Sequence, residues 1–198
     1  MGRTGAYASL LALVAIAAFV AGCASAPSHF YTLSAAATPG TSRSKATIVV
    51  GPVSVPAAVD QPQIVVSTSA NEVTFDEFNR WASPLQDNLA RVVAENLVAI
   101  LGTPRVTLSP SLLNSEIDYR VQVEVRNFES MPGKSAALDA VWTVRRQKDG
   151  KSEIGRTSVR EPVQDGSYDA LAAAHSRAVA RLSQEIADAV RKLEPISS

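Results

Sequence analysis

The chain has a single cysteine, Cys23, among its 198 residues, and only two histidines. One cysteine cannot form an intramolecular disulfide, so a domain built from this sequence must be held together by its hydrophobic core. Aromatic residues are also sparse, at 6% of the chain, whereas the hydrophobic share as a whole is 46%. The composition therefore predicts one folded domain that relies on its hydrophobic core.

Neither sign of charge is in excess, because 19 Lys and Arg residues stand against 19 Asp and Glu residues. Binding to a nucleic acid backbone depends largely on basic side chains that displace counterions from the phosphates. A balanced chain lacks that driving force. We therefore do not expect nucleic acid as a partner.

The common catalytic and metal-binding motifs are missing as well. His29 and His175 are far apart in the sequence, and neither has a histidine or carboxylate four residues further on. Gly133-Lys134-Ser135 resembles the end of a phosphate-binding loop, but Phe128 occupies the position of the first glycine, so a turn is predicted. We predict no catalytic residue, no metal site and no enzyme activity. His175, on an apolar helix stripe, is expected to be a partly buried residue with its hydrogen bonds satisfied.

A short apolar run at the N-terminus ends in Val20-Ala21-Gly22-Cys23, which matches the lipobox of bacterial lipoprotein signals. The uncharged run from Ala6 to Ala21 is shorter than the roughly 20 residues of a membrane-spanning helix. We expect cleavage between Gly22 and Cys23, diacylglycerol on the Cys23 thiol and an acyl chain on its new amino group. Several acyl chains together give stable membrane anchoring.

The residue after Cys23 bears on the choice of membrane. Ala24, where Asp would favour retention at the inner membrane, favours the inner leaflet of the outer membrane. Residues 1–22 are interpreted as a lipoprotein signal peptide and residues 23–28 as a lipidated tether. The covalent lipid on Cys23 is the only non-protein group that we expect, and no cofactor is predicted.

Alternating and β-branched stretches predict strands over residues 30–33, 47–55, 63–68, 72–75, 117–126, 136–146 and 152–161. A turn at Ala70-Asn71 would join two of them, and Asp149-Gly150 is typical of a type I′ turn. Gly51-Pro52 predicts a bulge or an edge position in the second strand. The segment 34–46, rich in small residues, is expected to be a flexible loop.

Two helices are predicted from apolar stripes at helical spacing. The first follows Pro84, with Ser83 and Gln86 as a capping box, and ends at Gly102. The second runs from about Ser167 to Lys192 and closes the chain. Since each helix has one apolar face, both are expected to pack on the sheet.

Asp60, Gln61, Arg80 and Trp81 make up the predicted contact surface. The break in the second strand suggests an exposed sheet edge, which can pair with another chain. Arg and Trp are also frequent anchors of protein interfaces. The surface would serve self-association or the docking of a partner. Packing of Trp81 in the core, just before the first helix, is the alternative.

Several segments follow the lipobox in a distinctive order: Phe30-Tyr31-Thr32-Leu33, Gly51-Pro52-Val53, Val59 to Val65, Arg80 to Leu85 and Ala174 to Ala178. Together they resemble the ABC-type transport auxiliary lipoproteins, the PqiC-like family. The resemblance covers residues 29–190, which is essentially the whole chain after the tether.

The resemblance implies a single α/β (α+β) domain over residues 29–192 and a C-terminal tail over residues 193–198. The fold would have a mixed or antiparallel sheet with two long helices packed on it, similar to the anticodon-binding-like fold of the TolB N-terminal domain. The implied role is an outer-membrane-anchored, periplasmic docking subunit of an MCE-type ABC transport system, which moves lipids between membranes and supports envelope integrity. Expected partners are an MCE-domain protein, ABC transporter subunits and a second copy of the chain.

Other classes of function stay open at this stage. A lipid-binding shuttle would need an apolar cavity, and a lipoprotein of another envelope machine, such as lipopolysaccharide export, would share the same anchor. An envelope hydrolase would need a nucleophile and a base, and the two histidines make that a poor match.

Overall fold

The computed structural model describes residues 26–41, 43–109 and 116–194, so Gly22 and Cys23 lie outside the described residues. The described chain forms two sheets and two helices. The strands are β1 (His29–Tyr31), β2 (Ile48–Ser54), β3 (Gln63–Ser69), β4 (Glu72–Trp81), β5 (Val106–Leu108), β6 (Tyr119–Met131), β7 (Ser135–Arg146) and β8 (Ser152–Pro162), and the helices are α2 (Leu85–Leu101) and α3 (Tyr168–Leu193). This mixed α+β domain confirms the predicted fold class.

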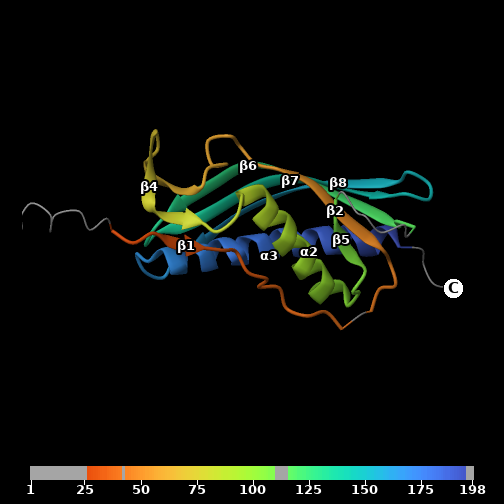
Figure 1. Cartoon of the computed structure of the whole chain (residues 1–198). Coiled ribbons are helices and arrows are strands. Elements are labelled where there is room, and N and C mark those ends of the chain that lie inside the picture. Colours follow the sequence, from red (N-terminus) through yellow and green to blue (C-terminus); the bar gives the residue numbers. More distant parts are fainter. Residues whose placement is uncertain (1–25, 42, 110–115, 195–198) are drawn as a thin grey trace, which may run out of the picture.

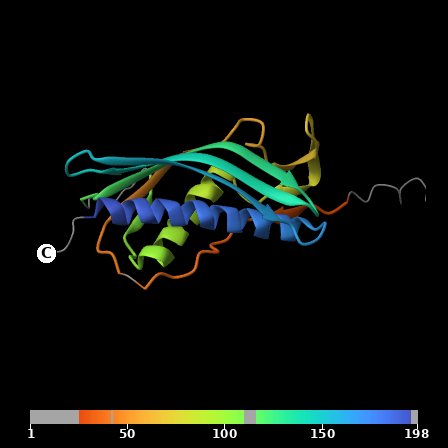
Figure 2. The same ribbon diagram turned by 180° about the vertical axis from the view of Figure 1, so that it is seen from behind.

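The larger sheet has five strands in the order β5-β2-β6-β7-β8. Strands β6, β7 and β8 form the predicted antiparallel meander, and β2 runs parallel to both β5 and β6. In β6, Tyr119, Val121, Val123 and Val125 are buried and alternate with more exposed polar residues, as predicted. Figures 1 and 2 show both helices on one face of this sheet. Because only that face is covered, every second side chain along β6 is apolar and packs against the helices.

Strand β2 lies inside the five-stranded sheet, which corrects the expectation of an exposed edge at this strand. Gly51-Pro52 does produce the predicted bulge, because the register with β6 shifts between Val50 and Val53. Both neighbours of β2 come from later parts of the chain. The residues of β2 itself therefore could not show that parallel strands would pair with both of its edges.

The helices begin and end close to the predicted residues, but one capping interaction differs. Within the described part of the chain no side chain caps the start of α2, so the capping box of Ser83 and Gln86 does not form. At the other end, Gly102 has a left-handed φ of 62° and its N–H donates to the Val98 carbonyl. Ser167 caps α3, because its hydroxyl accepts a hydrogen bond from the Ala170 N–H at 3.1 Å.

The turn between β7 and β8 is longer than predicted. Of the two predicted central residues, Gly150 has a positive φ of 73° and Asp149 does not. A type I′ turn needs a positive φ at both. Its N–H donates to the Arg146 carbonyl at 3.1 Å, which closes a wider turn. The segment around Gly133 is the predicted turn, since it joins β6 to β7.

The smaller sheet has the order β1-β4-β3 and lies at one end of the molecule, next to the start of the described chain (Figure 1). Strands β3 and β4 form the predicted hairpin around Ala70-Asn71, and β4 continues six residues beyond the predicted Phe75 to reach Trp81. Strand β1 adds to β4 in parallel, with Phe30 opposite Arg80 and Tyr31 opposite Trp81.

The segment between β1 and β2 is hydrogen-bonded to α2, which corrects the expectation of a flexible loop. The Asn96 side-chain oxygen accepts from the N–H groups of Ala36 and Ala37 at 3.1 and 3.0 Å. Further along, the N–H of Gly40 donates to the Ala99 carbonyl at 3.1 Å. The backbone amides of a segment without secondary structure are thus satisfied by a helix and a buried side chain.

The apolar stripes of the two helices meet the five-stranded sheet in one hydrophobic core. Its fully buried large side chains include Leu33, Ile48, Leu89, Leu97, Leu138, Leu171, Leu182 and Ile186. Asn96 also donates to Ser183 at 3.2 Å, so a polar bridge joins the two helices inside this core. Within the described ranges, neither helix combines the length and apolarity needed to cross a bilayer.

Candidate interaction surfaces

The structure brings three of the four predicted contact residues to the surface on neighbouring segments. Asp60 and Gln61 are exposed in the loop between β2 and β3. Arg80 is half-buried near the end of β4, and its guanidinium lies 3.5 Å from the Glu77 carboxylate. The loop and β4 are joined because the Trp81 N–H donates to the Pro62 carbonyl at 2.8 Å.

Trp81 itself packs in the core, which corrects its assignment to the contact surface and agrees with the alternative interpretation. Only 5% of the residue is exposed. Its ring meets Phe128 edge-on with centroids 6.2 Å apart, and it meets His175 at 6.4 Å. A partner therefore cannot reach this side chain without unfolding the domain.

His175 is fully buried between Phe128 and Trp81, whereas partial burial was expected. Its ring stacks on Phe128 with centroids 3.8 Å apart, and its Nε2 lies 2.8 Å from the Ser130 hydroxyl. Among the described residues Nδ1 has no hydrogen-bond partner, so the imidazole is only half satisfied there. Burial lowers the pKa of His175 to about 3, which keeps the ring neutral. Because the Ser130–His175 pair is enclosed, no substrate can approach it in the folded state.

Exposed phenylalanines gather on the smaller sheet, and sequence reasoning missed them. Phe30 on β1 is 65% exposed, and Phe75 and Phe78 on β4 are 47% and 46% exposed. Val73 on the same strand is 52% exposed. These four residues are called the phenylalanine face below. Exposed large apolar side chains that share one small sheet commonly mark a contact with a protein or a membrane.

The position of Phe78 is set by the partly buried carboxylate of Asp76. Asp76 accepts hydrogen bonds from the N–H groups of Phe78 and Asn79, both at 2.9 Å, and from the Tyr168 hydroxyl at 2.6 Å. Burial raises the pKa of Asp76, but these hydrogen bonds outweigh burial and hold its pKa below the usual range. The same stretch interrupts the pairing with β3, because the register shifts between Gln63 and Ile64. Asp76 therefore folds β4 into a bulge that carries Phe78.

Tyr31 ties β1 to the same bulge. Its hydroxyl donates to the Asn79 side-chain oxygen at 2.9 Å, and its ring lies beside Tyr168 with centroids 5.8 Å apart. The pKa of Tyr168 is raised by burial and by its bond to the Asp76 carboxylate. The Phe30 side chain lies on the opposite face of β1 from that of Tyr31, because successive side chains of a strand point to opposite faces. The phenylalanine face thus rests on a hydrogen-bonded frame.

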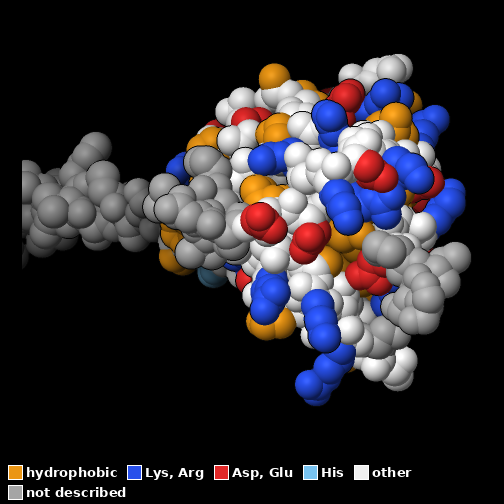
Figure 3. All heavy atoms as spheres, turned by 90° about the vertical axis from the view of Figure 1, so that its right-hand side faces the viewer, with side chains coloured by type: hydrophobic (Ala, Val, Ile, Leu, Met, Phe, Trp, Pro, Cys, Tyr) orange, Lys and Arg blue, Asp and Glu red, His pale blue; other side chains and the backbone are white. Residues whose placement is uncertain are grey.

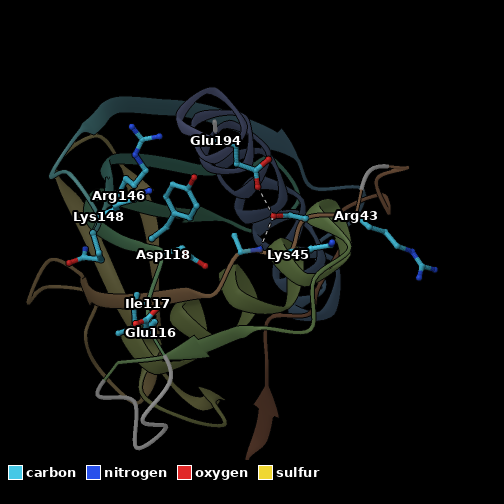
Figure 4. Close-up of a pocket in the computed structure, with 12 residues that line it drawn as sticks. Arg43, Lys45, Glu116, Ile117, Asp118, Arg146, Lys148 and Glu194 are labelled. Carbon is cyan, nitrogen blue, oxygen red and sulfur yellow. Dashed lines mark hydrogen bonds between the residues drawn. The ribbon is translucent and has the colours of Figure 1, made fainter. Parts of the chain in front are cut away.

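A polar groove of about 1120 Å³ lies at the other end of the domain, where α3 ends and the β7–β8 turn begins. Lys and Arg side chains surround acidic ones on this end (Figure 3). The groove is lined by Arg43, Ser44, Lys45, Ala46, Glu116, Ile117, Asp118, Tyr119, Arg146, Gln147, Lys148 and Glu194. Figure 4 shows the labelled side chains around the groove, from the segment before β2, the residues just before β6, the turn after β7 and the end of α3, with Arg43 pointing away from the others.

Several groups in the groove are held by hydrogen bonds. Arg146 forms an ion pair with Asp149 at 2.5 Å and donates to the Leu193 carbonyl. Hydrogen bonding to Arg146 lowers the pKa of Asp149 to about 2. Glu194 accepts from the Ser44 hydroxyl at 2.5 Å. The wall of the groove is therefore ordered, whereas Lys45 and Lys148 at its rim are exposed.

Within the described ranges, no three His, Cys, Asp or Glu side chains lie close enough together to hold a metal ion. The arrangement offers surfaces for binding: an apolar one at the end where the described chain begins and a polar one at the opposite end. The signal for the first was present in the sequence as phenylalanines spaced among acidic residues from Glu72 to Phe78. Whether such phenylalanines are buried depends on the strand's neighbours, which local spacing does not specify.

Known proteins share this fold. A protein of Xanthomonas campestris, XCC0632, superposes with a TM-score of 0.68 at 19% identity, over 83% of this chain and 98% of its own. An uncharacterized protein with a crystal structure superposes with a TM-score of 0.63 at 23% identity, over 81% of this chain and 99% of its own. No curated protein matches the sequence.

The sequence itself matches a family. The model of the ABC-type transport auxiliary lipoprotein component covers residues 31–187, from Tyr31 on β1 to Ala187 on α3. This range includes both sheets and most of both helices, so the match concerns the whole domain and not a local motif. The chain therefore belongs to the ABC-type transport auxiliary lipoprotein family, as its sequence motifs indicated.

Proposed function

We propose that this transport-associated lipoprotein is an outer-membrane-anchored docking subunit of an MCE-type ABC transport system for intermembrane lipid transport. The observation that carries the proposal is that the chain start and the polar groove lie at opposite ends of the domain. The described chain enters at the end formed by β1 and β4, and the end of α3 and the β7–β8 turn lie at the opposite end (Figure 1). The polar groove is lined by residues from that opposite end. A domain anchored through its N-terminus would present the groove to the periplasm.

The anchor follows from the lipobox and the short tether. Residues 24–28 separate Cys23 from β1, and fully extended they reach about 17 Å. Ala24 favours the outer membrane over the inner one. The domain would stand directly on the outer membrane, with its long axis extending away from it. A transporter component anchored in the inner membrane would meet the free end first.

The free end suits a specific protein contact. Its groove is lined by side chains of both signs, so a partner with the complementary pattern gains specificity and a faster encounter. The apolar stripes of α2 and α3, by contrast, are already packed in the hydrophobic core. That use of the stripes favours docking over a lipid-binding shuttle.

Charge reversal on two surfaces tests where the partner docks. Lys45→Glu with Lys148→Glu alters the rim of the groove, and Asp60→Arg with Arg80→Glu alters the originally predicted contact surface. We expect the groove pair to reduce co-purification with the MCE-domain protein at least about tenfold, as loss of matched charges does. Both double variants should keep a thermal midpoint close to that of the wild type, because Lys45, Lys148 and Asp60 are exposed and a surface ion pair such as Arg80–Glu77 contributes at most about 1 kcal/mol.

Each result has a definite meaning. Loss of co-purification only in the Asp60 and Arg80 variant would place the contact at the originally predicted surface and overturn docking at the groove. Full retention in both variants would reject both surfaces. Failure of the wild type to retain any MCE-domain protein or ABC transporter subunit would contradict the proposed role itself.

A further inference from the structure

We propose that the phenylalanine face, formed by Phe30, Val73, Phe75 and Phe78, is seated in the lipid surface to which Cys23 is anchored. This inference rests on the anchor in the proposed function and goes beyond it. The folded domain itself would contact the membrane, in addition to the covalent lipid on Cys23. The domain would then be held in one orientation instead of turning freely on its tether.

The first argument is position. Phe30 lies on β1, seven residues after Cys23, and is 65% exposed. The six peptide steps from Cys23 to His29 span at most about 21 Å when extended, so β1 cannot move far from an anchored lipid. Phe30 is paired with Arg80, two residues after Phe78, which brings β4 to the same end of the domain. The phenylalanine face is therefore an apolar surface that must stay close to the anchor.

The second argument is presentation. Phe78 stands on the bulge that Asp76 holds through the N–H groups of residues 78 and 79. Tyr168 on α3 bonds to the other oxygen of the same carboxylate at 2.6 Å, so the bulge is fixed to the core of the domain. A rigid apolar projection loses little conformational entropy when it enters a lipid surface. The structure orders these phenylalanines without burying them.

The third argument is charge, and it selects the kind of surface. Residues 46–79 contain no Lys or Arg, whereas Asp60, Glu72, Asp76 and Glu77 fall in this range. Arg80, which is paired with Phe30, has the Glu77 carboxylate 3.5 Å from its guanidinium, so its charge is matched within the same strand. Attraction to anionic lipids depends on basic side chains near the membrane. The phenylalanine face therefore suits lipids without net charge, and its contact depends on apolar burial. Such a contact should change little with salt, since screening acts on charges.

The test measures lipid contact at Phe78 in the full lipidated protein. If the Cys23 thiol carries lipid, Phe78→Cys supplies the only free thiol, which can be labelled with an environment-sensitive dye. Ile154→Cys is the matched control, because Ile154 on β8 is also a large exposed hydrophobic residue, at 71%, outside the phenylalanine face. Both proteins are reconstituted into phosphatidylcholine vesicles that contain a lipid-borne quencher. The unsubstituted protein is treated with the same dye.

We expect quenching at position 78 to be at least about threefold that at position 154, because apolar groups at a membrane interface lie roughly 5–10 Å into the headgroup boundary. This ratio should persist at high salt. Equal quenching at the two positions would overturn the inference while leaving the anchor intact. A dye at position 78 that is shielded from water but not quenched would mean that protein covers the face, which also overturns it. Labelling of the unsubstituted protein would show a free Cys23, and the anchor and the seating would fail together.

Discussion

At the scale of single residues, the most unusual environment belongs to His175. It joins α3 to the aromatic side chains of Trp81 and Phe128, and its one hydrogen bond reaches Ser130 on β6. The group is buried and neutral, so its role is structural. A buried histidine that stays neutral links the stability of the fold to pH, because the unfolded chain binds the proton more readily.

His175 makes the domain less stable in mild acid. Its pKa is about 3 when folded, against an ordinary value of 6.5, so only the unfolded state takes up this proton between those limits. The stabilising contribution is complete above pH 6.5 and declines as the pH falls towards 3. Between pH 7 and pH 5 the wild type should lose about 2 kcal/mol through this group. Urea unfolding at the two pH values measures the loss.

His175→Gln supplies the comparison, since its amide can still bond to Ser130 and cannot titrate. We expect the difference in unfolding free energy between pH 7 and pH 5 to shrink by about 2 kcal/mol in this variant. The same difference in both proteins would show that His175 does not account for the pH dependence. A folded His175→Gln protein should also keep its partner binding.

At the scale of elements, the contact between β7 and β8 depends on a missing side chain. Gly155 on β8 is paired with Trp142 on β7, and the indole ring lies over the glycine. The indole N–H donates to the Thr157 hydroxyl at 3.0 Å, which holds the ring in that place. A Cβ atom at Gly155 would lie 2.2 Å from the ring. The last strand of the sheet therefore tolerates only glycine there without a shift of the tryptophan.

Gly155→Ala should destabilise the domain by about 1–3 kcal/mol, the usual cost of forcing extra volume into a packed contact. Gly166→Ala is the matched control, because a Cβ at Gly166 meets nothing within 4 Å. Its unfolding free energy should stay within about 0.5 kcal/mol of the wild type. Equal midpoints for the two variants in thermal unfolding would mean that Trp142 moves aside freely.

At the scale of the whole molecule, the two ends of the domain differ in chemistry. One end carries the exposed phenylalanines and the start of the described chain, and the other carries the charged groove. Helix α3 runs the length of the domain between them, from Tyr168 beside Asp76 to the groove residue Glu194 that follows its last turn. Under the proposed function, an anchored domain of this shape would connect a membrane at one end to a partner at the other.

The anchor predicts the behaviour of Cys23→Ser. Without the thiol, the chain cannot receive diacylglycerol, so the uncleaved precursor should accumulate and incorporate no labelled fatty acid. Labelling of growing cells followed by purification of the protein measures this. Fatty acid on the serine variant equal to that on the wild type would rule out Cys23 as the lipid acceptor.

The choice of membrane is tested separately by Ala24→Asp, which leaves lipidation intact. We expect the mature protein to move from the outer-membrane to the inner-membrane fraction. An unchanged distribution would contradict the sorting argument without touching the anchor.

The sequence by itself determined most of the elements and their order, although the short edge strand β5 (Val106–Leu108) was not predicted. Both helices, the meander of β6, β7 and β8 and the β3–β4 hairpin follow from spacing patterns a few residues long, which is the range over which side chains of one element share a face. The family motifs also lie in the sequence. The predicted residues Asp60, Gln61 and Arg80 lie at the surface, but their role as a contact stays a prediction.

Tertiary structure alone decided which side chains are covered. Trp81 lies one residue after Arg80 yet is buried, because α3 and β6 bring His175 and Phe128 against it. Phe75 and Phe78 lie on the same strand, β4, and are exposed, because no described element covers that part of the small sheet. β2 became an interior strand through partners from later in the chain. Burial depends on residues distant in sequence, so local periodicity predicts a face but not what meets it.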